Sequence, residues 1–219
     1  MTCSKPVARF NVPRRPTCPT CHLPQRTCLC AWLRPTPNAV EVLILQHPLE
    51  ANQAKGSARL LALSLQRCRM LVAETLDDAA LADWLGPDDS APGDTVLLYP
   101  ATASAPGPLA DTALTPRRLV VLDATWRKSL RLLHLNPRLQ ALPRWPLVDP
   151  PAARYGALRK AALPEQLSTL EATCLALAQI EADTPRYAPL LDAFGAWVDD
   201  TSAAFRPTPA AITPGETPP

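Results

Sequence analysis

Four cysteines near the N-terminus have a spacing that can hold a metal ion. Cys18, Cys21, Cys28 and Cys30 span thirteen residues. Four thiolates can close a tetrahedron around one ion, and zinc is the usual occupant in a reducing compartment. An iron–sulfur cluster also takes four cysteines, so the spacing leaves both open, and His22 can replace one ligand. We see no apolar face in this segment and expect it to fold only with its metal.

An acidic residue follows an apolar run in the middle of the chain. Residues 118–122 (RLVVL) predict a buried strand, and Asp123 stands at its carboxyl end, where α/β sheets bind their ligands. A carboxylate in that place can act as a general base. It can equally cap the helix predicted next, as can Thr125, and Trp126 is more often a core anchor than a stacking platform.

Apolar runs alternate with helical patterns through the middle of the chain. This alternation predicts an α/β domain with a mainly parallel sheet and helices on both faces. Ligands should bind outside the carboxyl ends of the strands, at three loops: from Pro100 onward, over 123–126, and before Ser168. Ser168 and Glu171 are spaced as a capping box, which predicts the start of a helix there. The predicted strands cover 40–46, 69–73, 95–99, 118–122 and 146–148, and the predicted helices 51–65, 77–85, 126–135, 166–182 and 187–205.

Charge is unevenly distributed in a chain whose net charge is only +2. Residues 1–40 hold six basic residues and no acidic one, and residues 117–160 hold ten basic residues against two acidic ones. Two such blocks favour binding of a polyanion across two surfaces. The side chains that we expect to meet phosphate are Arg14, Arg15, Arg26, Arg127 and Lys128.

The sequence also predicts the compartment. No apolar run reaches the length of a membrane span, and no apolar core follows the first basic residue as in a secretory signal. The seven cysteines are an odd number, which argues against a secreted disulfide scaffold. We therefore expect a cytoplasmic protein with no membrane contact, and a disordered Pro-rich tail over 206–219.

Several segments, in order along the chain, resemble one family. The sequence DATWRK over 123–128, followed by a leucine-rich helix, is similar to the hallmark of the DTW-domain family. The segments QHPLE over 46–50, LYPA over 98–101 and LSTLEA over 167–172 agree with it, and the cysteine pattern resembles that of bacterial members. The resemblance covers roughly residues 18–205.

The resemblance implies a tRNA-uridine aminocarboxypropyltransferase. Such an enzyme moves the 3-amino-3-carboxypropyl group of S-adenosylmethionine to N3 of a tRNA uridine and releases methylthioadenosine. It also implies a SPOUT-like catalytic domain with a C-terminal knot over 37–205, after a basic arm and zinc module over 1–36. The residues that match the family's motifs and are expected to bind S-adenosylmethionine are Tyr99, Pro100, Ala101, Asp123, Thr125, Trp126, Arg159, Lys160, Leu167, Ser168 and Thr169.

Two residues are candidates for the base that takes the uridine N3 proton. Asp123 is the first, although it can instead bind the ammonium group of the donor. His47 is the second, because an imidazole accepts a proton near neutral pH, but it can also be a helix-entry residue before Pro48. One departure from the family stands near Ala153, where members often carry a serine.

Two other functions fit parts of the pattern. An RNA methyltransferase uses the same donor but leaves S-adenosylhomocysteine. A zinc-dependent RNA-binding module without catalysis needs only the cysteines and the basic blocks. SPOUT-like proteins are often dimers, whereas we expect a monomer here, and the modified tRNA position stays open.

Overall fold

The structure is a computed structural model that describes residues 16–51, 53, 56–86, 93–101, 115–151 and 167–204. Four predicted site residues, Arg14, Arg15, Arg159 and Lys160, lie outside the described residues. The same holds for the tail over 206–219 and for Ala153.

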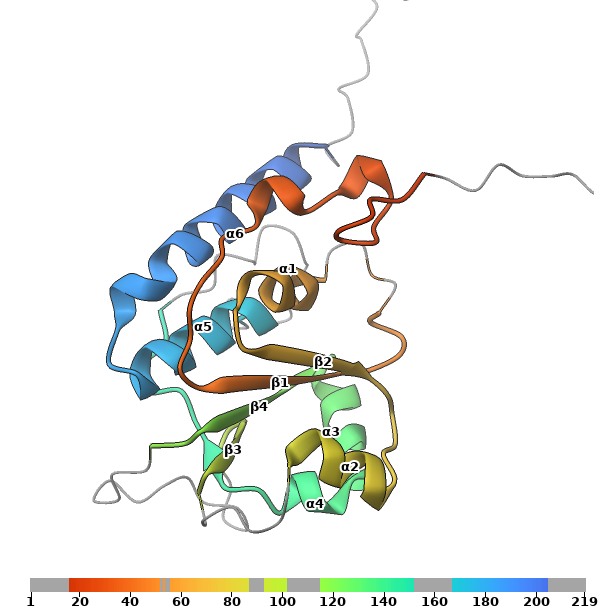
Figure 1. Ribbon diagram of the computed structural model, residues 1–219, viewed down its shortest axis with the longest axis vertical. Helices are drawn as coiled ribbons and strands as arrows, with labels where there is room; N and C mark the ends of the chain where they lie inside the picture. Colours follow the sequence, from red (N-terminus) through yellow and green to blue (C-terminus); the bar gives the residue numbers. More distant parts are fainter. Residues whose placement is uncertain are drawn as a thin grey trace, which may run out of the picture.

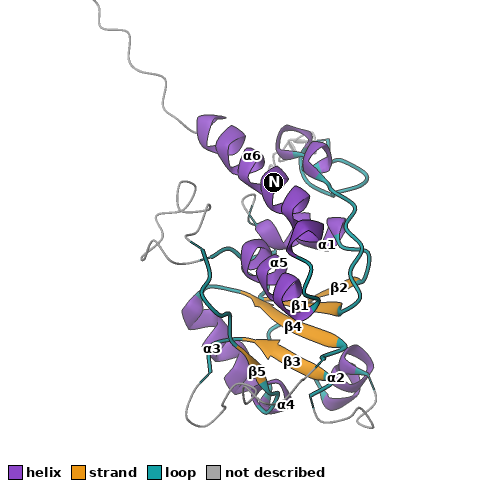
Figure 2. Cartoon of the chain, turned by 90° about the vertical axis from the view of Figure 1, so that its left-hand side faces the viewer, coloured by secondary structure: helices purple, strands orange, loops and turns teal. Residues whose placement is uncertain are grey.

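One five-stranded parallel sheet forms the centre of the described part of the chain. The strands stand in the order β2-β1-β4-β3-β5, seen in Figure 2. The two most apolar runs form the neighbouring strands β1 and β4, because strands inside a parallel sheet are buried on both faces. The strands are β1 (Glu41–Gln46), β2 (Cys68–Val72), β3 (Thr95–Leu98), β4 (Arg118–Asp123) and β5 (Arg144–Trp145).

Helices cover both faces of the sheet, as predicted (Figure 1). Alternate side chains of β1 divide between the two faces: Val42 and Ile44 join one apolar cluster, and Leu43 and Leu45 join the other. The first cluster includes side chains of α1 (Ser57–Ser64), α5 (Thr169–Ile180) and α6 (Thr184–Ala204). The second includes those of α2 (Asp78–Leu85), α3 (Trp126–Leu135) and α4 (Pro137–Gln140).

Several predicted boundaries are wrong, and the last helix begins at Thr184 rather than at residue 187. The helix predicted over 51–65 begins only at Ser57, because residues 47–51 form a turn in which the Glu50 amide donates to the His47 carbonyl. The strand predicted over 146–148 lies earlier, as β5, and Pro146, which has no N–H to donate, follows its last residue. The short α4 has no counterpart among the predicted helices, because four residues are too few to show a periodic pattern.

The cysteine segment packs against the main core, which corrects the expectation that it has no apolar face. It contains two short 3-10 helices, η1 (Gln25–Thr27) and η2 (Cys30–Trp32). Leu29 and Cys21 are each 1% exposed and belong to the same apolar cluster as α1, α5 and α6. The Arg59 side chain of α1 donates to the Cys21 carbonyl at 3.0 Å. The fold of this segment is therefore coupled to that of the sheet domain.

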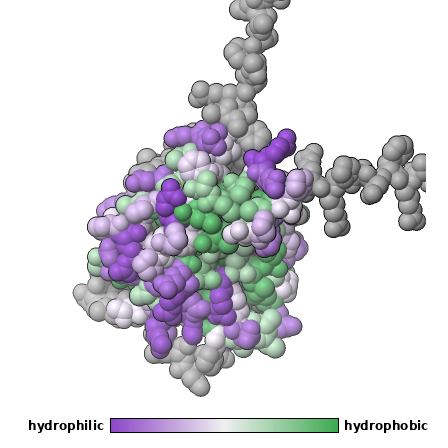
Figure 3. All heavy atoms as spheres, turned by 45° about the horizontal axis from the view of Figure 1, so that its top comes forward, coloured by the Kyte–Doolittle hydropathy of each residue, from purple (hydrophilic) through white to green (hydrophobic). Residues whose placement is uncertain are grey.

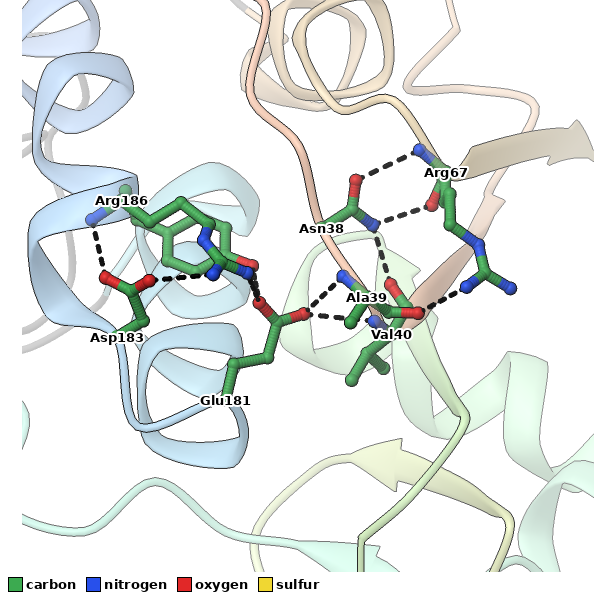
Figure 4. A network of polar contacts seen from close by, with 8 residues as sticks. Asn38, Ala39, Val40, Arg67, Glu181, Asp183 and Arg186 are labelled. Carbon is green, nitrogen blue, oxygen red and sulfur yellow. Dashed lines mark hydrogen bonds and ion pairs between the residues drawn. The ribbon is translucent and has the colours of Figure 1, made fainter.

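Glu181, just after α5, anchors the segment that leads into β1 at the amino ends of the strands (Figure 4). One carboxylate oxygen accepts from the amides of Ala39 and Val40, at 2.8 and 3.0 Å. The other accepts from Arg186 at 2.6 Å and from the buried Tyr187 hydroxyl at 2.7 Å. A hollow of about 440 Å³ lies beside this network, lined by Ala39, Val40, Arg67, Thr115, Pro116, Arg117, Ile180, Glu181 and Arg186.

The surface mixes polar and apolar areas. Figure 3 shows a band of apolar side chains across one face, bordered by hydrophilic ones. Among the described helices, none combines the length and the apolar character that crossing a membrane requires. The large apolar side chains that are exposed are Leu49, Leu63, Val72, Trp126, Leu130 and Val148. Of these, Trp126 follows directly on the end of β4, where the predicted site lies.

Candidate active site

Asp123 is held between two other segments at the carboxyl edge of the sheet. It is the last residue of β4 and lies opposite Gln46, the last residue of β1. The Gln46 amide nitrogen donates to Asp123 Oδ2 at 2.7 Å, and the Thr169 hydroxyl donates to Oδ1 at 2.6 Å. The carboxylate is only 8% exposed. Three motifs that are far apart in the sequence therefore meet at one carboxylate.

The geometry decides against Asp123 as a cap of α3. In the described residues its oxygens accept from Gln46 and Thr169, neither of which belongs to that helix. Thr125 occupies the N-cap position of α3 but makes no capping hydrogen bond with its side chain. Asp123 instead lies beside the first residue of α5, where the helix dipole stabilises an anion.

The imidazole of His47 is buried and tied on both sides. Nδ1 accepts from the Leu49 amide at 3.2 Å, and Nε2 lies 3.4 Å from a Glu74 carboxylate oxygen. A ring that accepts at Nδ1 carries its proton on Nε2 when neutral. The Arg131 guanidinium, 2.5 Å away, and His47 hold the pKa of the Glu74 carboxyl below its ordinary value. The His47 ring thus turns toward Glu74, while its backbone amide donates to the Asp123 carbonyl at 3.1 Å.

Lys128 is engaged within the protein. Its ammonium lies 2.7 Å from a carboxylate oxygen of Glu50, which is 7% exposed. The pair ties the QHPLE segment after β1 to the helix that follows Asp123. Lys128 is therefore less available to RNA phosphate than the sequence predicts, whereas Arg127 and Arg26 are exposed.

Tyr99, which follows β3, and Trp126, the first residue of α3, form a stacked aromatic pair. Their ring centroids are 5.1 Å apart and their planes differ by 9°. The Tyr99 hydroxyl lies 3.1 Å from the Ser129 hydroxyl, which donates to the Trp126 carbonyl at 2.8 Å. Trp126 is 56% exposed, so its interpretation as a core anchor is wrong. Pro100 and Ala101, which follow Tyr99, are exposed as well.

The N-terminus of α5 has the predicted capping box. The Ser168 hydroxyl accepts from the Glu171 amide at 3.2 Å, and a Glu171 carboxylate oxygen accepts from the Ser168 amide at 2.9 Å. Because Ser168 and Glu171 satisfy each other, the Thr169 hydroxyl is left to bind Asp123. Leu167, half-buried, leads into this turn.

The four N-terminal cysteines converge as the sequence predicts. Their sulfur atoms all lie within 4.8 Å of one another, with Cys18 and Cys30 at 3.5 Å and Cys21 and Cys28 at 3.7 Å. A tetrahedral zinc–thiolate site with Zn–S bonds of about 2.3 Å places its sulfur atoms about 3.8 Å apart, so the donor set fits zinc. His22 is exposed and is not part of this group.

The thiol pKa values in this group diverge. Backbone amides of Cys21 and Thr20 lower the pKa of Cys18 to about 6. The Cys18 sulfur in turn raises the pKa of Cys30 to about 12. In this arrangement one thiolate accepts hydrogen bonds from neighbouring thiols. A divalent cation would stabilise the group by displacing the protons of those thiols. Beyond this group, no other cluster of metal-ligating side chains occurs in the described part of the chain.

Three residues of the site, Gln46, Glu74 and Glu50, were not among those predicted from the sequence. Gln46 carried a detectable signal, since it ends one apolar run as Asp123 ends another, and adjacent parallel strands bring such positions together. Glu50 lies in a matching motif, but its pairing with Lys128 spans 78 residues. Glu74 follows a weakly apolar strand and carries no local signal.

Comparison with known proteins shows the family of this chain. The family model described as the DTW domain matches residues 15–202. The chain belongs to the DTW-domain family. Within that family, tRNA-uridine aminocarboxypropyltransferase 2 of Drosophila melanogaster is 31% identical over 174 residues, covering 77% of this chain and 68% of the relative. The mouse protein of the same name is 29% identical over 177 residues, covering 77% of this chain and 57% of the relative.

A plant relative is also similar. The tRNA-uridine aminocarboxypropyltransferase A of Arabidopsis thaliana is 28% identical over 138 residues, covering 56% of this chain and 52% of the relative. The chain thus spans little more than half the length of several relatives that it matches. No solved structure matches this DTW-domain chain.

Proposed function

We propose that this protein transfers the 3-amino-3-carboxypropyl group of S-adenosylmethionine to N3 of a uridine in tRNA. The observation that carries the proposal is the placement of Asp123 at the carboxyl edge, bonded to Gln46 and Thr169. The exposed Trp126, three residues later, stacks on Tyr99. Relatives named as tRNA-uridine aminocarboxypropyltransferases support it.

The proposed reaction is a displacement at the γ-carbon of the sulfonium. Uridine N3 forms a bond to that carbon, the carbon–sulfur bond breaks, and neutral methylthioadenosine leaves with the electron pair. The N3 proton must go to a base. Asp123 is the first candidate, and its two hydrogen bonds would hold the carboxylate in one orientation.

Asp123 has a second possible role as the partner of the donor's ammonium group. Both roles need an oriented carboxylate with a lone pair left free, and each Asp123 oxygen accepts one hydrogen bond from the described residues. His47 is a weaker candidate for the base, because both of its ring nitrogens have partners. His47 would instead position the turn that begins where its carbonyl accepts from the Glu50 amide.

The donor would occupy the space outside the strand ends. Tyr99, Pro100 and Ala101 follow β3, Thr125 and Trp126 follow Asp123, and Leu167, Ser168 and Thr169 precede or open α5. The exposed face of Trp126 offers a surface for a nucleobase. Arg159 and Lys160 remain predicted ligands of the donor, and the SPOUT-like knot over the C-terminal part remains a prediction.

The N-terminal segment would serve the RNA. Zn²⁺ bound by Cys18, Cys21, Cys28 and Cys30 would stabilise it, and the exposed Arg26 lies inside it. With Arg14, Arg15 and Arg127 it would contact tRNA phosphates. The same proposal includes a boundary after residue 36 between the N-terminal module and the catalytic domain. It also includes a monomeric, cytoplasmic protein that does not contact a membrane.

Mass spectrometry of tRNA treated with the protein and S-adenosylmethionine tests the function. The expected product is a uridine carrying the aminocarboxypropyl group, with methylthioadenosine as the spent donor. Addition of a methyl group with S-adenosylhomocysteine would identify the methyltransferase alternative instead. Absence of any S-adenosylmethionine binding would leave the non-catalytic RNA-binding module.

A further inference from the structure

Arg144, in the edge strand β5, is a buried cation without an anionic partner among the described residues. The residue is 4% exposed. Its Nη2 donates to the Gln140 carbonyl at 3.0 Å, whereas Nε and Nη1 are shielded from solvent and have no hydrogen-bond partner. Buried guanidinium groups in folded proteins are normally paired, so these two nitrogens call for an explanation.

The guanidinium lies beside Tyr99, one of the residues expected to bind the donor. Its central carbon is 5.4 Å from the centroid of the Tyr99 ring, whose other contacts are Trp126 and Ser129. Tyr99 follows the end of β3, and β5 pairs with that strand through Leu97 and Leu98. Arg144 is in register with Leu97, two residues before Tyr99, so its side chain reaches the proposed donor site through its contact with the Tyr99 ring. Burial lowers the pKa of Arg144, which reflects the cost of keeping a cation out of water.

Other basic side chains at this edge already have partners. Lys128 is paired with Glu50, and Arg131 is paired with Glu74. Arg127 is exposed on α3. Arg144, beside Tyr99, therefore combines burial, a fixed orientation and unpaired N–H groups. A guanidinium in this state suits a carboxylate, and the low local dielectric strengthens the pair.

We infer that Arg144 binds the carboxylate of the aminocarboxypropyl donor. The inference rests on the function proposed above and adds a residue that determines donor specificity. Asp123 repels a carboxylate, so the anion of the donor needs a cation elsewhere in the site, and Arg144 would supply it.

The test compares S-adenosylmethionine with decarboxylated S-adenosylmethionine, which lacks only the carboxylate. Calorimetric titration of the full chain gives Kd for both ligands. The wild type should bind S-adenosylmethionine more tightly, on the order of 10- to 100-fold. Arg144→Met should bring this ratio of Kd values close to one, because only the binding of S-adenosylmethionine should become weaker. Arg144→Lys, which keeps the charge, should give an intermediate ratio.

Two controls make the result specific. Arg117→Met removes an exposed guanidinium at the opposite edge of the sheet and should keep the wild-type ratio. Arg144→Met should melt at the wild-type temperature or above, because an apolar residue of similar volume often replaces a buried charge without loss. Should it fail to fold, a wild-type ratio in Arg144→Lys would count against the inference.

Other results would overturn the inference in distinguishable ways. An unchanged ratio in a folded Arg144→Met variant would show that the guanidinium does not meet the donor. If tRNA affinity fell instead, Arg144 would serve an RNA phosphate. If the wild type bound neither ligand, the proposed function itself would fail, and the role of Arg144 with it.

Discussion

The side-chain amide of Gln46 donates to Asp123 Oδ2 at 2.7 Å, across the paired ends of β1 and β4. The oxygen of the same amide, Gln46 Oε1, is buried without a hydrogen-bond partner among the described residues. A carboxylate and an unpaired acceptor therefore lie side by side at the edge where we place the reaction. Both can accept a hydrogen bond from an N–H or ammonium group of a substrate.

Asp123→Asn should reduce transfer while the protein stays folded. If Asp123 is the base, single-turnover transfer falls about 10²- to 10⁴-fold with donor affinity nearly unchanged. If Asp123 binds the ammonium group, the Kd for S-adenosylmethionine rises as well. Asp199→Asn, an exposed change on α6, is the matched control and should behave as wild type. Full activity of Asp123→Asn would remove the residue from the mechanism.

Trp126→Ala should weaken substrate binding more than stability. The indole is 56% exposed, so the fold loses mainly its stacking on Tyr99, about 1 kcal/mol. If a base stacks on the outer face, its loss weakens binding by about 1–3 kcal/mol, and Trp126→Phe restores part of it. KM for both substrates and thermal melting are the measurements. Leu130→Ala, also exposed on α3, should leave KM unchanged.

Cys21→Ser should abolish metal binding and destabilise the whole protein. Cys21 is buried in the same apolar cluster as α1, α5 and α6, so loss of the ion also loosens that packing. Atomic emission should show zinc falling from one equivalent to none, and melting should show one transition at lower temperature. Cys68→Ser, which lies outside the cysteine group, should keep its zinc. Retention of a full equivalent of zinc in Cys21→Ser would refute the ligand assignment.

Stability should depend on pH through Glu74. Arg131 and His47 lower the pKa of this carboxyl, so its contribution is present above its ordinary pKa and is lost as the pH falls through the folded value. Arg131→Met should therefore melt at a slightly lower temperature than wild type at pH 7. This gap between the two melting temperatures should close in acid. The gap should also shrink with added salt, because both side chains are accessible to solvent. Arg127→Met should show no such pH-dependent gap.

Local signals in the sequence determined the elements and the candidate ligands. Apolar runs placed β1, β3 and β4, the change from strand to helix after Asp123 placed α3, and Ser168 with Glu171 placed the start of α5. The cysteine spacing predicted the sulfur cluster. Each of these depends on contacts within one turn or one run of residues, so composition and spacing are sufficient to find them.

Only the tertiary structure decided which of these residues meet. The strand order put β1 beside β4 and so brought Gln46 to Asp123, and the packing of α5 brought Thr169 to the same carboxylate. The same packing exposed Trp126 and buried Arg144. Strand order and helix packing depend on the burial of two whole apolar clusters at once, so the local sequence around one residue does not specify its distant partner.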